Sequence, residues 1–182
     1  LRDDWTVAEV DHLAGSLLAI PVKDFLAGFR VFTTLFAPTP TTSLAGLSWT
    51  RHHAVVNVLE DVKNRLHVLT PPADGVGEWV RSAFPVDGGV LAIGAGGVDP
   101  VESDDVWVVT TGYLTPSTLS LATLAPIAGS GSAERLKAAP SFFDATGLVT
   151  EQRFATSADG TRVPYFLVGR AAQLHPEPGA EP

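Results

Sequence analysis

The sequence of 182 residues contains no cysteine and no methionine. Without cysteine the chain forms no disulfide and offers no thiolate ligand to a metal, so its stability has to come from the packing of its core. Clusters of Lys and Arg are also missing, and the formal net charge is −8. Phosphate backbones and anionic membrane surfaces attract clustered cations, so we expect neither nucleic acid nor membrane as a partner.

Long apolar runs are absent too. No stretch approaches the ~20 apolar residues that a membrane helix needs, and neither end resembles a secretory leader. We therefore expect a soluble, cytoplasmic protein. Because the sequence starts at Leu1 without an initiator methionine, we also expect a processed product or a piece of a longer polypeptide.

Glycine and proline are abundant, with 17 and 14 residues, and they are spread along the chain. Turn residues spaced about every eight to twelve positions are typical of many short strands, so the sequence predicts an all-β fold. Earlier segments predict strands at 14–20 and 29–36, with a turn or helical kink at 24–28 between them. The residues from Ala128 to Ala133 predict a flexible link.

Two groups of expected strands follow one another from residue 44 onward. The first group is 44–49, 53–60, 64–70 and 78–84. The second group is 90–93, 105–112 and 118–124, with Gly94 to Gly97 as a turn. Four antiparallel strands joined by short turns form one blade of a β-propeller, although a β-sandwich gives the same periodicity. Trp49, Trp79 and Trp107 are expected to fill the gaps between stacked sheets.

The clearest local signal lies near the end of the chain. Runs rich in β-branched and aromatic residues, 154–157 and 161–168, flank Asp159-Gly160. Glycine readily adopts the positive φ of a tight hairpin turn, so the two runs predict a β-hairpin. Both faces of its second strand are apolar, which predicts cover on each side.

This hairpin region resembles prolyl oligopeptidase family serine peptidases, at the junction where the β-propeller ends and the α/β-hydrolase domain resumes. The matching positions are Glu151, Gln152, Phe154, Thr156, Ser157, Asp159, Gly160, Thr161, Val163, Pro164 and Phe166. Weaker similarities lie at 1–5, 14–17, 50–51, 114–119 and 136–144. The resemblance implies propeller blades over residues 1–147, the first hairpin of the hydrolase domain over 148–168 and a frayed tail over 169–182.

The family uses a serine in a G-x-S-x-G turn, a histidine that accepts its proton and an aspartate that holds the imidazole. We interpret Ser130, in Ala128-Gly-Ser-Gly-Ser132, as a linker serine, because Ala128 and Ser132 stand where that motif has its two glycines. In family order all three catalytic residues follow the hairpin and would lie beyond Pro182. No catalytic residue is carried over, and whether this chain is itself an enzyme stays open.

Three further residue groups contain residue types that are common in binding sites. His52 and His53 are adjacent, so on a strand they face opposite sides, and we interpret them as surface or turn residues. Asp99, Glu102, Asp104 and Asp105 lack the spacing of a calcium loop and are expected in a solvated loop. Gly94-Ala-Gly-Gly97 fails the dinucleotide pattern because Asp99 and Pro100 follow it. We therefore expect no cofactor-binding residue and no metal ligand.

Two hypotheses remain. In the first, the chain is a fragment of a prolyl oligopeptidase-like serine endopeptidase that cleaves short peptides after proline. The propeller would then gate substrate access, and the fragment alone would be inactive because it lacks the rest of the hydrolase domain. In the second, the chain is a non-catalytic all-β module that binds a peptide or a protein.

Overall fold

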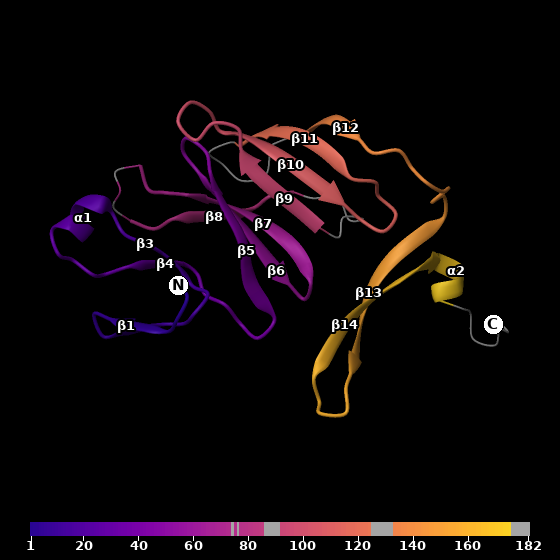
Figure 1. Cartoon of the computed structure of the whole chain (residues 1–182), viewed down its shortest axis with the longest axis horizontal. Coiled ribbons are helices and arrows are strands. Elements are labelled where there is room, and N and C mark those ends of the chain that lie inside the picture. The colour runs from indigo at the N-terminus through magenta and orange to yellow at the C-terminus, as the bar shows by residue number, and fades with distance from the viewer. Residues whose placement is uncertain (74, 76, 86–91, 125–132, 176–182) are drawn as a thin grey trace.

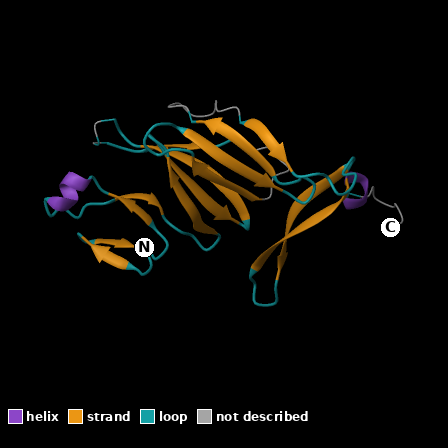
Figure 2. Ribbon diagram, turned by 45° about the horizontal axis from the view of Figure 1, so that its top comes forward, coloured by secondary structure: helices purple, strands orange, loops and turns teal. Residues whose placement is uncertain are grey.

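The computed structural model describes residues 1–73, 75, 77–85, 92–124 and 133–175. Most of them lie in antiparallel strands, which form two four-stranded and three two-stranded sheets. The four-stranded sheets occupy the centre, with the N-terminal strands on one side and the last hairpin on the other (Figures 1 and 2). The predicted all-β class is confirmed.

The first four-stranded sheet contains consecutive strands in the order β5-β6-β7-β8. They are β5 (Thr42–Trp49), β6 (Ala54–Glu60), β7 (Lys63–Thr70) and β8 (Val80–Ala83). This sheet confirms the first predicted blade, with changes of a few residues at the strand ends. Asp61 and Val62 alone connect β6 to β7, and both have positive φ, 44° and 62°.

The second four-stranded sheet has the order β12-β11-β10-β9 and confirms the second blade. Its strands are β9 (Ala92–Gly97), β10 (Asp105–Thr111), β11 (Thr118–Thr123) and β12 (Glu134–Ala138). The prediction of a turn at Gly94 to Gly97 is wrong, because these residues form the second part of β9 and pair with β10. A Cβ on Gly97 would lie 2.0 Å from the backbone oxygen of Trp49, so glycine is needed where the two sheets approach.

Strand β6 lies between two apolar layers because successive side chains point to opposite faces. Val55 faces the second blade in a cluster that includes Ile93 and Val106. On the other face, Val56 belongs to a cluster with Leu35. The first blade is therefore covered on both sides, which agrees with stacked propeller blades.

Four short strands precede the first blade. They are β1 (Trp5–Val7), β2 (Val10–His12), β3 (Leu17–Ala19) and β4 (Thr33–Phe36), with the short helix α1 (Val22–Leu26) between β3 and β4. The last two of these strands, β3 and β4, supply that second cover. The strand predicted at 29–36 begins only at Thr33, and Phe29 remains 61% exposed. Leu35 and Phe36 are buried against the first blade.

The second blade is covered on one side only. Its outer face comprises Trp107, Val109, Leu119 and Leu121, which form the cross-strand pairs Trp107↔Leu121 and Val109↔Leu119. Trp107 and Val109 are 41% and 48% exposed. Within the described residues Trp107 faces no second sheet, so its predicted role in filling a gap between sheets stays a prediction. Trp49 is half-exposed, whereas Trp79 packs against the core cluster of the first blade.

The predicted hairpin is confirmed and is longer than expected. Strands β13 (Leu148–Thr156) and β14 (Arg162–Arg170) pair along their whole length, and Gly160 has a φ of 85°. In the turn, the Asp159 carboxylate accepts hydrogen bonds from the Ser157 hydroxyl and the Thr161 amide, and these lower the pKa of Asp159 to about 2.

The chain after the predicted hairpin is more ordered than the frayed tail expected from residue 169. Strand β14 continues to Arg170, and the short helix α2 (Ala171–Leu174) follows. Residues 176–182 lie outside the described part, as does most of the link predicted at 128–133. Within the described residues, neither helix is long enough to cross a bilayer.

Candidate functional site

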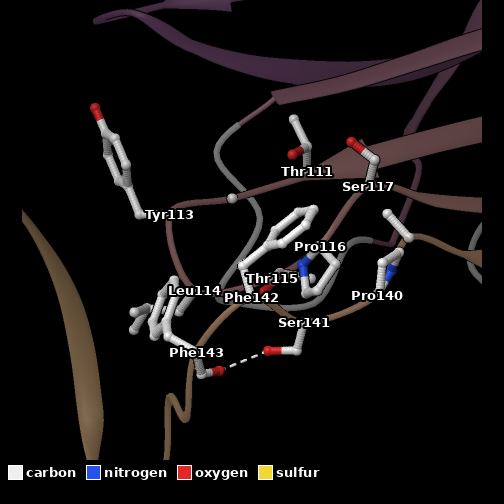
Figure 3. Close-up of a pocket in the computed structure, with 12 residues that line it drawn as sticks. Thr111, Tyr113, Leu114, Thr115, Pro116, Ser117, Pro140, Ser141, Phe142 and Phe143 are labelled. Carbon is white, nitrogen blue, oxygen red and sulfur yellow. Dashed lines mark hydrogen bonds between the residues drawn. The ribbon is translucent and has the colours of Figure 1, made fainter.

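A pocket of about 250 Å³ opens at one end of the second blade, where two loops meet (Figure 3). One wall is the β10–β11 loop, from Thr111 to Ser117, and the other is the segment 139–143 that leaves β12. The pairing of β11 with β12 brings these walls together, and the Ala139 amide donates to the Ser117 carbonyl at 2.8 Å. The pocket is therefore built on the edge of a regular sheet.

The pocket wall is aromatic and rich in proline, and it carries no charged side chain. Phe142 is 89% exposed and its ring lies beside Pro116, while Tyr113 projects away from the loop (Figure 3). Hydrogen bonds shape both walls: the Gly112 amide donates to the Thr115 carbonyl at 2.9 Å, and the Ser141 hydroxyl to the Phe143 carbonyl at 2.6 Å. Such a surface suits apolar or proline-containing peptide segments, and it provides no acid–base pair.

The two blades also meet at a polar contact. The Asp104 carboxylate accepts hydrogen bonds from Thr50 Oγ1 and the His52 amide, both at 2.8 Å, and lies 2.7 Å from His52 Nδ1. The Arg51 amide donates to the Ser103 carbonyl at 2.9 Å. This contact connects the β5–β6 turn with the loop before β10.

Burial alone would raise the pKa of Asp104, but the hydrogen bonds from His52 and Thr50 outweigh it and hold that pKa below the usual range. Burial lowers the pKa of His53, and the negative charge of Asp104 opposes this effect only in part. His53 is 2% exposed, and its Nδ1 lies 2.8 Å from Thr70 Oγ1. His53 therefore lies in the β5–β6 turn, as the sequence predicts, but it is buried and not at the surface.

The acidic residues considered for calcium hold separate local contacts. Asp99 caps the backbone amides of Val101 and Glu102, whereas Asp105 accepts a hydrogen bond from Thr123. Among the described residues, no group of three or more His or acidic side chains is placed to hold a metal ion. The sequence predicts no catalytic or ligand residue, and no local pattern in it marks the pocket.

The last hairpin has two chemically different faces. On one face, Glu151 forms an ion pair with Arg153 at 2.9 Å and contacts His175, and Arg153 donates to the Leu174 carbonyl. These contacts attach α2 to the hairpin. On the other face, Gln152 and Phe166 face each other across the two strands and point toward the blades.

Comparisons with known proteins agree with this architecture. No family model matches the chain. The chain is 36% identical over 176 residues to a protein of Sinorhizobium fredii described as an uncharacterized peptidase, y4nA, and the match covers 93% of this chain and 23% of that protein.

Solved structures show the same fold. A post-proline cleaving enzyme from Rickettsia typhi superposes with a TM-score of 0.71 at 23% identity, over 94% of this chain and 24% of that one. Oligopeptidase B from Trypanosoma brucei superposes with a TM-score of 0.59 at 19% identity, over 78% of this chain and 22% of that one.

The chain thus spans about a quarter of the length of the first relatives that it matches. Its two stacked four-stranded sheets and its terminal hairpin have the order expected from the sequence. The predicted similarity to prolyl oligopeptidase family peptidases is confirmed, and it extends over one part of the length of those proteins.

Proposed function

We propose that this chain is a fragment of a cytoplasmic, prolyl oligopeptidase-like serine endopeptidase that cleaves short peptides after proline. In this proposal residues 1–147 are late propeller blades, which gate access of substrate. Residues 148–168 are the first hairpin of the hydrolase domain. The observation that carries the proposal is the 36% identity to a peptidase over 93% of this chain. The solved relative that cleaves after proline supports it through its fold.

The exposed outer face of the second blade also supports the fragment proposal. Trp107 and Val109 lie on a regular sheet face against which no described sheet packs, and they stay 41% and 48% exposed. Exposed apolar area costs about 25 cal/mol per Å², so a further sheet on this face would stabilise the fold. The hairpin, likewise, forms a two-stranded sheet that no other strand of the described residues extends.

We expect the chain alone to be inactive, because its sequence contains no G-x-S-x-G turn. The test is an assay of the purified chain with a chromogenic Gly-Pro amide, with and without a serine-directed inhibitor. The expected result is no hydrolysis above the uncatalysed rate. Turnover that the inhibitor abolishes would contradict the predicted inactivity.

The pocket favours the second function, a non-catalytic module that binds peptides. Its wall of Tyr113, Pro116 and Phe142 resembles the aromatic grooves that hold extended proline-rich peptides. Titration of the chain with a labelled proline-rich peptide tests this function, with Phe142→Ala as the variant. Binding that Phe142→Ala abolishes would support the module, and equal binding by both chains would exclude this pocket.

A further inference from the structure

The hairpin contacts the blades through one of its two faces. Gln152 on β13 lies directly opposite Phe166 on β14, so both side chains lie on the same face. The face that carries Glu151 and Arg153 instead holds α2. The blade-facing side is therefore free to contact other parts of the chain.

That side meets the turn between β6 and β7. The Gln152 Nε2 donates a hydrogen bond of 2.6 Å to the backbone carbonyl of Asp61. The ladder between β6 and β7 ends at the pair Glu60↔Lys63, so this carbonyl takes no part in it. Arg162 adds a weak ion pair, with its Nη1 3.5 Å from Asp61 Oδ2.

An aromatic contact completes the junction. The ring of Phe166 lies 5.6 Å from the ring of Tyr113, which belongs to the β10–β11 loop of the second blade. Lys63 Nζ lies 5.4 Å from the centre of the Phe166 ring. The cross-strand pair Gln152 and Phe166 therefore reaches both blades at once.

These contacts are made by few groups. Within the described residues, no backbone hydrogen bond joins β13 or β14 to either blade. Much of the hairpin, including its turn, projects away from the sheets (Figure 1). The orientation of the hairpin therefore depends on a small number of side chains.

The receiving turn has an unusual backbone. Val62 has a φ of 62°, in the left-handed region that β-branched residues rarely occupy, and Asp61 has a φ of 44°. The Asp61 amide is held by a hydrogen bond of 3.0 Å to the Thr41 carbonyl. Strained backbone of this kind persists where surrounding contacts determine it, and it concentrates at functional contacts.

We propose that the Asp61–Val62 turn and Tyr113 form a latch that holds the hairpin against the blades through Gln152 and Phe166. The latch fixes the hairpin in one orientation, and its release lets the hairpin swing as a unit. If the hairpin is the first element of a hydrolase domain, the latch also sets the gap between that domain and the blades. That consequence rests on the proposed function, whereas the latch itself does not.

The absence of cysteine permits a direct test in the full chain. Spin labels on Ala45→Cys in β5 and on Ala158→Cys in the hairpin turn report the distance between blade and hairpin by pulsed electron paramagnetic resonance. Both positions are exposed. Dilution with unlabelled chain keeps the measured distances within one molecule.

Two variants break the latch, and one serves as a control. Gln152→Glu replaces the donor with a carboxylate that repels the Asp61 carbonyl, and Tyr113→Ala removes the ring from an exposed loop. Gln173→Glu makes the same change of charge on α2, where Gln173 is exposed. Circular dichroism checks that each variant folds.

We expect one narrow distance in the parent and in Gln173→Glu, and loss of that narrow distance in Gln152→Glu and Tyr113→Ala. Should Gln152→Glu fail to fold, Tyr113→Ala carries the test alone. A parent without a narrow distance would overturn the latch. So would variants that keep the parent's distribution.

Discussion

Gly97 lies where the two blades approach closely. Its amide donates to Ser48 Oγ at 2.8 Å, and a Cβ at this position would lie 2.0 Å from the Trp49 carbonyl oxygen. The clash is with backbone atoms, so it is relieved only by moving the sheets apart. Gly94 and Gly96, on the same strand, have no atom within 4 Å of an added Cβ.

We therefore expect Gly97→Ala to lower the free energy of unfolding by about 3 kcal/mol, at the upper end of the usual cost of overpacking. Gly94→Ala is the matched control and should change stability little or raise it slightly. Urea denaturation of both variants measures the difference. Equal stability of the two variants would show that the blades do not approach at Gly97.

Two histidines, the buried His53 and the half-buried His67, predict a second effect at the residue scale. Burial lowers the pKa values of both His53 and His67 from 6.5. Below pH 6.5 the unfolded chain then binds more protons than the folded chain, so stability is full above that pH and is lost as the pH falls toward the folded-state values. Protonation of carboxylates lowers the stability further below about pH 5.

We expect His53→Asn, which keeps a partner for Thr70 but does not titrate, to flatten the fall in unfolding free energy between pH 6.5 and about 5. In the double variant His53→Asn/His67→Asn this fall in unfolding free energy should be smaller still. Denaturant unfolding at a series of pH values measures these slopes. Slopes equal to that of the parent would contradict a lowered histidine pKa.

At the scale of elements, the β6–β7 turn stores strain in an otherwise regular hairpin. Val62 occupies the left-handed region that glycine adopts without steric cost. Val62→Gly should raise the free energy of unfolding by about 1 kcal/mol, because the relief of strain exceeds the added flexibility of the unfolded chain.

Val101→Gly is the control for this change, since Val101 lies in an exposed loop and has no positive φ. It should leave stability unchanged or lower it. Thermal melts of the two variants provide the comparison. A Val62→Gly chain that melts below the parent would mean that contacts of the valine side chain outweigh its strain.

Many elements follow from local pattern alone. Strands β5, β6, β7, β10 and β11 and the last hairpin were predicted because apolar alternation and turn residues agree there. The turn predicted at Gly94 to Gly97 failed because glycine serves close packing as well as turns. The need for glycine at position 97 follows only from the position of the Trp49 backbone in the folded chain.

The candidate site was less accessible to sequence reasoning. Its walls lie on either side of β11 and β12 and meet only through their pairing. Gln152 is separated from Asp61 by 91 positions. Its place in the hairpin motif does not predict the hydrogen bond between the two residues. Such contacts depend on how the sheets stack, which local patterns do not specify.

At the scale of the whole molecule, the outer face of the second blade should promote self-association. Val109 is 48% exposed among neighbouring apolar side chains of that face, whereas Val101 is 69% exposed in a loop. Val109→Lys should lower the concentration-dependent association of the chain, and Val101→Lys, with the same change of charge, should not. Sedimentation velocity over a range of concentrations measures this, and equal association of both variants would contradict it.

The central claim is that these residues are part of a larger serine peptidase. Source cells treated with a fluorophosphonate probe and blotted with an antibody against the β13–β14 hairpin test it in one measurement. The account predicts a probe-labelled band about four times larger than this chain of 19.1 kDa, since the chain covers 23% of its peptidase relative. An unlabelled band of 19.1 kDa would contradict it.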